Sequence, residues 1–156
     1  MIRRVNLFAP EFGYDDADPD GYRAGMDRFG AKIGAERLGG SVYDVPPGQS
    51  ICPYHFEYGD EEWLLVLEGR ASVRHPEGTD ELGPGDTVCF PEGPAGAHKV
   101  TNDTGEPLRV FMLSTRRDPA VSVYPDGDKV GVWGGPGIEE GFFRRESGVD
   151  YFDREL

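Results

Sequence analysis

The chain of 156 residues contains only three histidines, so the sequence around each one is informative. Two of them, His55 and His98, lie in short apolar segments bounded by turn-forming residues. Side chains alternate between the two faces of a β-strand, so a strand over residues 51–57 places His55 and Glu57 on one face. An imidazole and a carboxylate that point the same way are a pair of candidate metal ligands.

A second carboxylate follows in the next apolar segment. If Leu64 points to the interior, the same alternation directs Glu62 inward, and a barrel would bring His98 beside His55. Two neutral imidazoles with one or two carboxylates suit a divalent first-row metal such as Fe, Mn, Zn or Ni, and a bound metal would offset the cost of burying Glu57 and Glu62 together. The alternative from spacing alone is that these residues lie on a solvated rim and have unrelated roles.

Short strands are the elements that would position these residues. From residue 38 to residue 113, apolar segments are separated by turn sequences at intervals of about 8 to 12 residues, which is typical of an antiparallel sandwich or barrel. The candidate strands span residues 41–45, 51–57, 62–67, 70–75, 87–90, 98–101, 108–114, 121–124 and 130–133. Glu68-Gly69 is interpreted as a tight hairpin turn and residues 76–79 as a longer one, which together predict a meander of hairpins.

Composition narrows the class of protein further. With 23 glycines and 13 prolines, the chain is rich in turns, and its length suits one domain. The net charge of −13 repels phosphate backbones and anionic lipids, so we expect no nucleic-acid partner and no membrane partner. The first residues lack the apolar region of a signal peptide, so we expect a cytoplasmic protein.

Residues 47–69 resemble the first sequence motif of the cupin superfamily, in which a His-x-His pair is followed by Glu and then by Gly. His55 stands at the first histidine of the pair, and Glu62 and Gly69 follow at the spacing of the family. Glu57 replaces the usual second histidine. This replacement gives a harder ligand set, which suits Mn, Fe or Zn better than Cu.

Residues 85–102 resemble the second cupin motif, with Pro-x-Gly at 91–93 followed by His98 and Asn102. The loop before His98 is two residues longer than usual. The resemblance implies an all-β cupin double-stranded β-helix, a jelly-roll barrel that is usually dimeric. It also implies a metal ion held in the barrel by residues matching His55, Glu57, Glu62 and His98.

We therefore expect a barrel core over residues 38–116, an N-terminal arm at 1–37, and C-terminal strands with an aromatic tail at 117–156. The tail is expected to pack on the barrel or on a partner subunit through Phe142, Phe143, Tyr151 and Phe152. Both alternating faces of residues 63–67 are apolar, which predicts a central strand covered on both sides. The uncovered apolar surface of this strand and of the tail predicts a homodimer.

The function predicted from these residues is that of a metal-binding cupin, acting as a metal-dependent enzyme on a small molecule in the barrel. Oxygenase, isomerase and lyase chemistry all remain open. If Glu57 is not a ligand, its carboxylate would serve as a general base. The alternative is a non-catalytic cupin that binds a small ligand and holds a structural metal or none.

Overall fold

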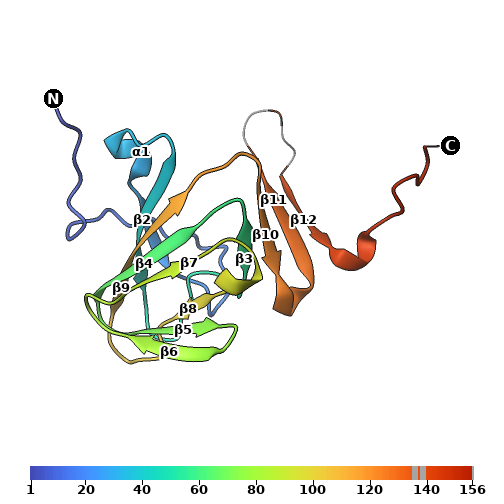
Figure 1. Ribbon diagram of the computed structural model, residues 1–156. Coiled ribbons are helices and arrows are strands. Elements are labelled where there is room, and N and C mark those ends of the chain that lie inside the picture. Colours follow the sequence, from blue (N-terminus) through green and yellow to red (C-terminus); the bar gives the residue numbers. More distant parts are fainter. Residues whose placement is uncertain (135–136, 138–139, 156) are drawn as a thin grey trace.

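Two walls of antiparallel strands enclose the interior of the protein (Figure 1). The structure is a computed structural model, and it describes residues 1–134, 137 and 140–155. The larger wall is a sheet in the order β1-β2-β9-β4-β7. Its strands are β1 (Gly25–Arg28), β2 (Leu38–Val45), β9 (Leu108–Thr115), β4 (Glu62–Glu68) and β7 (Thr87–Phe90). The predicted all-β jelly-roll fold is confirmed.

The opposite wall consists of two smaller sheets. One has the order β6-β5-β8, formed by β6 (Gly78–Leu82), β5 (Ala71–His75) and β8 (Lys99–Thr101). The other has the order β12-β11-β10-β3, formed by β12 (Gly141–Arg144), β11 (Lys129–Trp133), β10 (Ala120–Tyr124) and β3 (Phe56–Tyr58). Reciprocal backbone hydrogen bonds between His55 and His98, at 3.1 and 2.8 Å, join the ends of these two sheets.

The core lies between the larger wall and the β6-β5-β8 sheet. Alternate residues of β4 and β9 point inward, so Leu64, Val66 and Val110 are fully buried. They pack against Val73 of β5 and Val100 of β8. Removal of this apolar surface from water is the main stabilising contribution to the barrel.

The predicted strand over residues 51–57 is wrong in its first half, because regular pairing begins only at Phe56. Pro53 has no N–H group to donate to a ladder, and the backbone of Ile51 bonds instead to Val100. The alternation therefore fails before His55. Cys52, which alternation would place on the opposite face, lines the same cavity as His55.

The predicted hairpin at Glu68-Gly69 is also wrong, since β4 pairs with β7 and β9 while β5 pairs with β6 and β8. The turn carries the chain from one wall to the other, so the topology is a jelly roll and not a meander. Gly69 is required there. Its φ is +79°, and a Cβ atom would lie 2.2 Å from the carbonyl oxygen of Pro107.

Three strands lie outside the predicted set. β1 belongs to the segment predicted as an arm, and it pairs with β2 at the edge of the larger wall. β6 and β12 are largely exposed, so neither has the apolar alternation that identifies a half-buried strand. The helical segments are single turns: α1 (Gly30–Ile33), η1 (Pro94–Gly96), η2 (Pro125–Gly127) and η3 (Arg145–Ser147).

The outer face of β4 and the C-terminal tail remain exposed within one chain. Leu64 and Val66 cover the core, whereas Trp63 is 49% exposed. In the tail, Phe142 contacts the ring of Trp133 edge-on at 5.0 Å, while Tyr151 is 88% exposed. Figure 1 shows the chain leaving the barrel beyond β12. Among the described residues, no helix is long and apolar enough to cross a membrane.

Candidate metal centre

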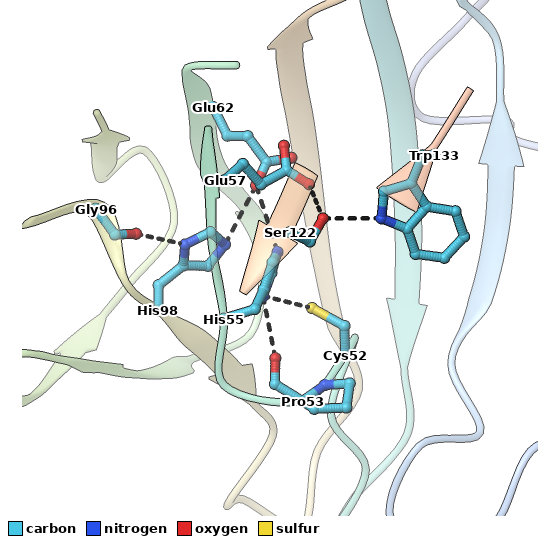
Figure 2. A network of polar contacts seen from close by, with 9 residues as sticks. All are labelled: Cys52, Pro53, His55, Glu57, Glu62, Gly96, His98, Ser122 and Trp133. Atoms are coloured by element: carbon cyan, nitrogen blue, oxygen red, sulfur yellow. Dashed lines mark hydrogen bonds and ion pairs between the residues drawn. The ribbon is translucent and has the colours of Figure 1, made fainter. Parts of the chain in front are cut away.

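The candidate metal centre lies where the two walls meet, and its side chains come from both of them (Figure 2). His55 and His98 are hydrogen-bonded neighbours on the smaller wall, and their ring centroids are 4.7 Å apart. Glu62 begins β4 on the larger wall, between Phe90 and Ser114. Its carboxylate is directed between the two imidazoles, so the inward orientation predicted for Glu62 is confirmed.

Hydrogen bonds to the backbone fix the orientation of both imidazoles. Nδ1 of His55 lies 3.0 Å from the carbonyl oxygen of Pro53, and Nδ1 of His98 lies 2.9 Å from that of Gly96. A carbonyl oxygen only accepts, so both Nδ1 atoms carry the proton. The unprotonated Nε2 atoms then face Glu62, and this tautomer is the one that binds a metal through Nε2.

The ligand atoms are close enough together to share one ion. Oε2 of Glu62 lies 3.9 Å from Nε2 of His55 and 3.4 Å from Nε2 of His98, and one ligand atom from each residue lies within 4.8 Å of the others. Ligand atoms about 2.1 Å from one ion are at most about 4.2 Å apart, so both measured separations fit. Nε2 of His98 is buried without a hydrogen-bond partner among the described residues, as expected of a ligand atom.

The electrostatics of the cluster favour a bound cation. Burial, together with the charges of Glu57 and Asp60, raises the pKa of Glu62 to about 8. Burial and the neighbouring His55 lower the pKa of His98 to about 3, and burial also lowers the pKa of His55. The protein environment therefore disfavours a bare carboxylate and keeps both imidazoles neutral. A divalent cation would compensate the carboxylate and bind the free lone pairs, so these residues fit a metal ion.

Glu57 lies in the same cavity but outside this three-residue cluster. Its Oε1 atom accepts a hydrogen bond of 3.1 Å from the hydroxyl of Ser122, which lies directly opposite it in the pairing of β3 with β10. The same hydroxyl accepts a 2.8 Å bond from the indole N–H of Trp133 (Figure 2). Burial raises the pKa of Glu57, and the Ser122 bond acts in the opposite direction.

The cavity that contains these groups has a volume of about 500 Å³, which is within the usual range of sites for small molecules. The lining residues that were not predicted from the sequence include Tyr22 and Met26 from the N-terminal segment, and Tyr124 and Trp133 from the C-terminal strands. Strands 121–124 and 130–133 were predicted, but nothing in the sequence links them to His55. The third histidine, His75, lies outside the cluster, and its Nε2 atom is 3.3 Å from a carboxylate oxygen of Asp80.

The fold and the site together define a jelly-roll domain with a candidate metal centre on its inner surface. Residues 41–114 match the family model of the cupin domain, in agreement with the two motifs of the sequence. No curated protein matches the chain in sequence.

Several solved structures resemble most of the chain. A sugar phosphate isomerase of the cupin superfamily from Silicibacter pomeroyi has a TM-score of 0.81 at 22% identity, covering 96% of this chain and 98% of that one. A protein from Acidithiobacillus ferrooxidans, named as a proposed sugar phosphate isomerase, has a TM-score of 0.76 at 25% identity, covering 83% and 81%. A polyketide cyclase from Streptomyces resistomycificus has a TM-score of 0.63 at 25% identity, covering 77% and 84%.

Proposed function

We propose that the protein is a metal-dependent isomerase that moves a proton between neighbouring carbon atoms of a small hydroxy-carbonyl compound. The observation that carries the proposal is the position of Glu57, which shares a cavity with a cluster of three metal-type ligands without belonging to it. A carboxylate that is not a ligand is available as a base. The name of the similar protein from Acidithiobacillus ferrooxidans supports this class of reaction.

His55, Glu62 and His98 would hold a divalent metal such as Fe, Mn, Zn or Ni. Three protein ligands leave coordination positions open, which is the arrangement of catalytic sites and not of closed structural ones. When bound, the metal supplies a Lewis acid that polarises the oxygen atoms of the substrate.

Glu57 would act on the carbon next to the carbonyl group. Its carboxylate would remove the proton from this carbon, and the C–H electron pair would become the second C–C bond of an enediol. The π electron pair of the carbonyl group would move to the carbonyl oxygen, which takes up a proton from solvent. Return of the proton to the former carbonyl carbon gives the isomer, while the hydroxyl proton exchanges between the two oxygen atoms through solvent. No electron is gained or lost overall. Ser122 and Trp133 would keep the carboxylate in place during both transfers.

The experiment incubates metal-loaded protein with a panel of sugars and sugar phosphates in D2O. We expect deuterium at the carbon next to the carbonyl, detected by proton NMR, together with interconversion of the isomers. Glu57→Gln is expected to retain its metal and to lose activity by about a hundredfold or more. His98→Ala is expected to lose both metal and activity.

Two outcomes would contradict the proposal. If Glu57→Gln loses its metal, then Glu57 is a fourth ligand and the base assignment is wrong. If the wild-type protein binds compounds of the panel without exchange or turnover, the non-catalytic ligand-binding cupin is the better description.

A further inference from the structure

A second cavity, of about 470 Å³, adjoins the candidate metal centre. Glu57 and Glu62 line both cavities, so a molecule in the second one reaches the same two carboxylates. Tyr43, Met112 and Trp133 also belong to both linings. A substrate that reacts beside Glu57 therefore has room for a further group on this side.

Arginines line the second cavity on the inner face of the larger wall. In β1, Arg28 lies opposite Ser41, whose other neighbour is Met112 of β9. Side chains on one face of a strand recur every second residue, so Met112 and Ser114 lie on one face of β9. Arg116, which directly follows the end of β9, continues this series on the same face. Arg28 and Arg116 are thus directed to the same side of the sheet, and Arg117 completes this wall of the cavity.

Among the described residues, none of these three arginines has a carboxylate oxygen within 4.0 Å, the limit for an ion pair. Arg28 forms one side-chain hydrogen bond, from Nε to the sulfur of Met26, which leaves its terminal N–H groups for a ligand.

Four carboxylates also line this cavity, those of Glu57, Asp60, Glu62 and Asp118, and among the described residues none of them forms an ion pair with the three arginines. Asp60 accepts a hydrogen bond of 3.1 Å from the hydroxyl of Thr115. Burial raises the pKa of Asp60, and the Thr115 bond and the charge of Arg117 act in the opposite direction. Asp118 follows Arg117 in an exposed loop. Arg117 is therefore the arginine with acidic neighbours, and Arg28 and Arg116 are the two whose charge is available.

We infer that Arg28 and Arg116, assisted by Arg117, bind an anionic group, phosphate or carboxylate, on the molecule that reacts at Glu57. The planar guanidinium group pairs with either anion through two parallel N–H···O bonds, which fixes orientation as well as charge. The assignment to a substrate depends on the proposed function. Binding of the anion itself does not depend on it. A local cationic wall would also offset the repulsion of an anionic substrate by a protein of net charge −13.

The test measures binding of inorganic phosphate by isothermal titration calorimetry, first to protein stripped of metal with EDTA and then to metal-loaded protein. We expect saturable binding to the stripped protein. The double variant Arg28→Gln/Arg116→Gln is expected to bind phosphate at least about tenfold more weakly, since hydrogen bonds to charged groups are each equivalent to roughly that factor. Arg145→Gln/Arg154→Gln, which removes two positive charges from the exposed C-terminal segment, is the matched control and should bind like wild type.

Malonate titrated in the same way distinguishes the two sources of negative charge. Tighter binding of phosphate identifies a phosphorylated substrate, and tighter binding of malonate identifies a carboxylated one. Either result supports the anion site if the double variant binds that anion more weakly than wild type does. Arg28 and Arg116 are exposed, so the melting temperature of the double variant should match that of wild type, which excludes misfolding as the cause of weaker binding.

Two results would overturn the inference: no binding to the stripped protein, or binding that the double variant retains. Phosphate that binds only to metal-loaded protein, and is lost in His98→Ala, would be a ligand of the metal and not of the arginines. If phosphate binding depends on the arginines but the protein takes up no metal, the anion site stands and the proposed isomerase fails. The two conclusions can therefore be separated.

Discussion

The Nε2 atom of His98 lies 3.4 Å from Oε2 of Glu62, and within the described part of the chain it has no hydrogen-bond partner. The side chain of His98 is only 2% exposed, so water does not readily replace that partner. A buried nitrogen lone pair beside a buried carboxylate is expensive unless a cation lies between them. This relationship makes His98 the residue whose removal tests the centre most directly.

We predict that the untagged protein, purified without chelator, contains nearly one equivalent of Fe, Mn, Zn or Ni, and that His98→Ala contains almost none. Loss of one of three ligands should lower the affinity enough for the metal to be removed during purification. Mass spectrometry with inductively coupled plasma measures the content. His75→Ala is the control, because His75 pairs with Asp80 outside the cluster. Equal metal content in the wild-type and His98→Ala proteins would place the ion elsewhere.

The sequence predicts the three clustered residues partly by local alternation and partly by the resemblance to the two cupin motifs. Glu62 shares its face with Leu64, whose burial sets the orientation of the whole strand. His98 directly precedes β8 and shares a backbone pair with His55. Alternation is sufficient for Glu62, whereas the approach of His98 to His55 depends on pairing between distant segments, which the resemblance to the two motifs implies and local spacing does not.

The surroundings of the cluster could not be predicted in the same way, because they depend on pairings between distant segments. Ser122 reaches Glu57 only because β10 pairs with β3, 65 residues earlier in the chain. Arg28 ends β1, an edge strand of four residues that follows an acidic, turn-rich segment. So short a strand has no alternation of apolar and polar residues by which it could be predicted. The turn at Gly69 shows the same limit, since a turn sequence does not say whether its flanking strands pair with each other.

Ser122→Ala is predicted to destabilise the protein. The Ser122 hydroxyl is 1% exposed, and its removal leaves the indole N–H of Trp133 and a carboxylate oxygen of Glu57 without their partner. Unsatisfied buried polar groups cost about 1–3 kcal/mol, so the free energy of unfolding should fall by about that amount in urea denaturation. Ser147→Ala removes an exposed hydroxyl and should change the free energy by less than about 0.5 kcal/mol. Equal effects of both substitutions would show that the buried network is unimportant.

Gly96→Ala is predicted to weaken metal binding without changing any ligand. A Cβ atom at this position would lie 1.8 Å from the carbonyl oxygen of Pro91, so the backbone must move. The carbonyl oxygen of Gly96 orients His98 through Nδ1, and the loss of such a contact typically lowers metal affinity by about 10- to 100-fold. Titration against a competing chelator measures the change. Gly105→Ala, where a methyl group meets no atom within 4 Å, should keep the wild-type affinity.

The contact between Asp27 and Lys32 predicts sensitivity to acid. Asp27 accepts hydrogen bonds from Nζ of Lys32 at 2.6 Å and from the backbone N–H of Glu11 at 2.9 Å, and these bonds lower its pKa below the usual 3.8. A lowered carboxylate pKa stabilises the folded state above the unfolded pKa, and this contribution is lost as the pH falls through the folded value. The melting temperature of Asp27→Asn should therefore lie below that of wild type at pH 7.

The same difference in melting temperature should shrink as the pH falls from about 3.8, the pKa of the unfolded state, through the lower pKa of the folded state, below which the aspartate is protonated in both states. Asp16→Asn, which changes an exposed carboxylate, is the control for the general effect of charge. A difference between Asp27→Asn and wild type that stays constant between pH 7 and pH 3 would show that the ion pair does not contribute.

The outer face of β4 predicts a homodimer. Trp63 and Leu65 lie opposite Leu113 and Phe111 of β9, and the exposed indole of Trp63 gives this face the aromatic character of protein interfaces. Light scattering should therefore report about 34 kDa, twice the mass of 17.2 kDa. Trp63→Arg places a charge in this face and should give a folded monomer, whereas Tyr58→Arg, at an exposed position of β3, should remain dimeric. A wild-type mass of 17.2 kDa would contradict the dimer. If Trp63→Arg keeps the mass of a dimer, the interface lies on another surface.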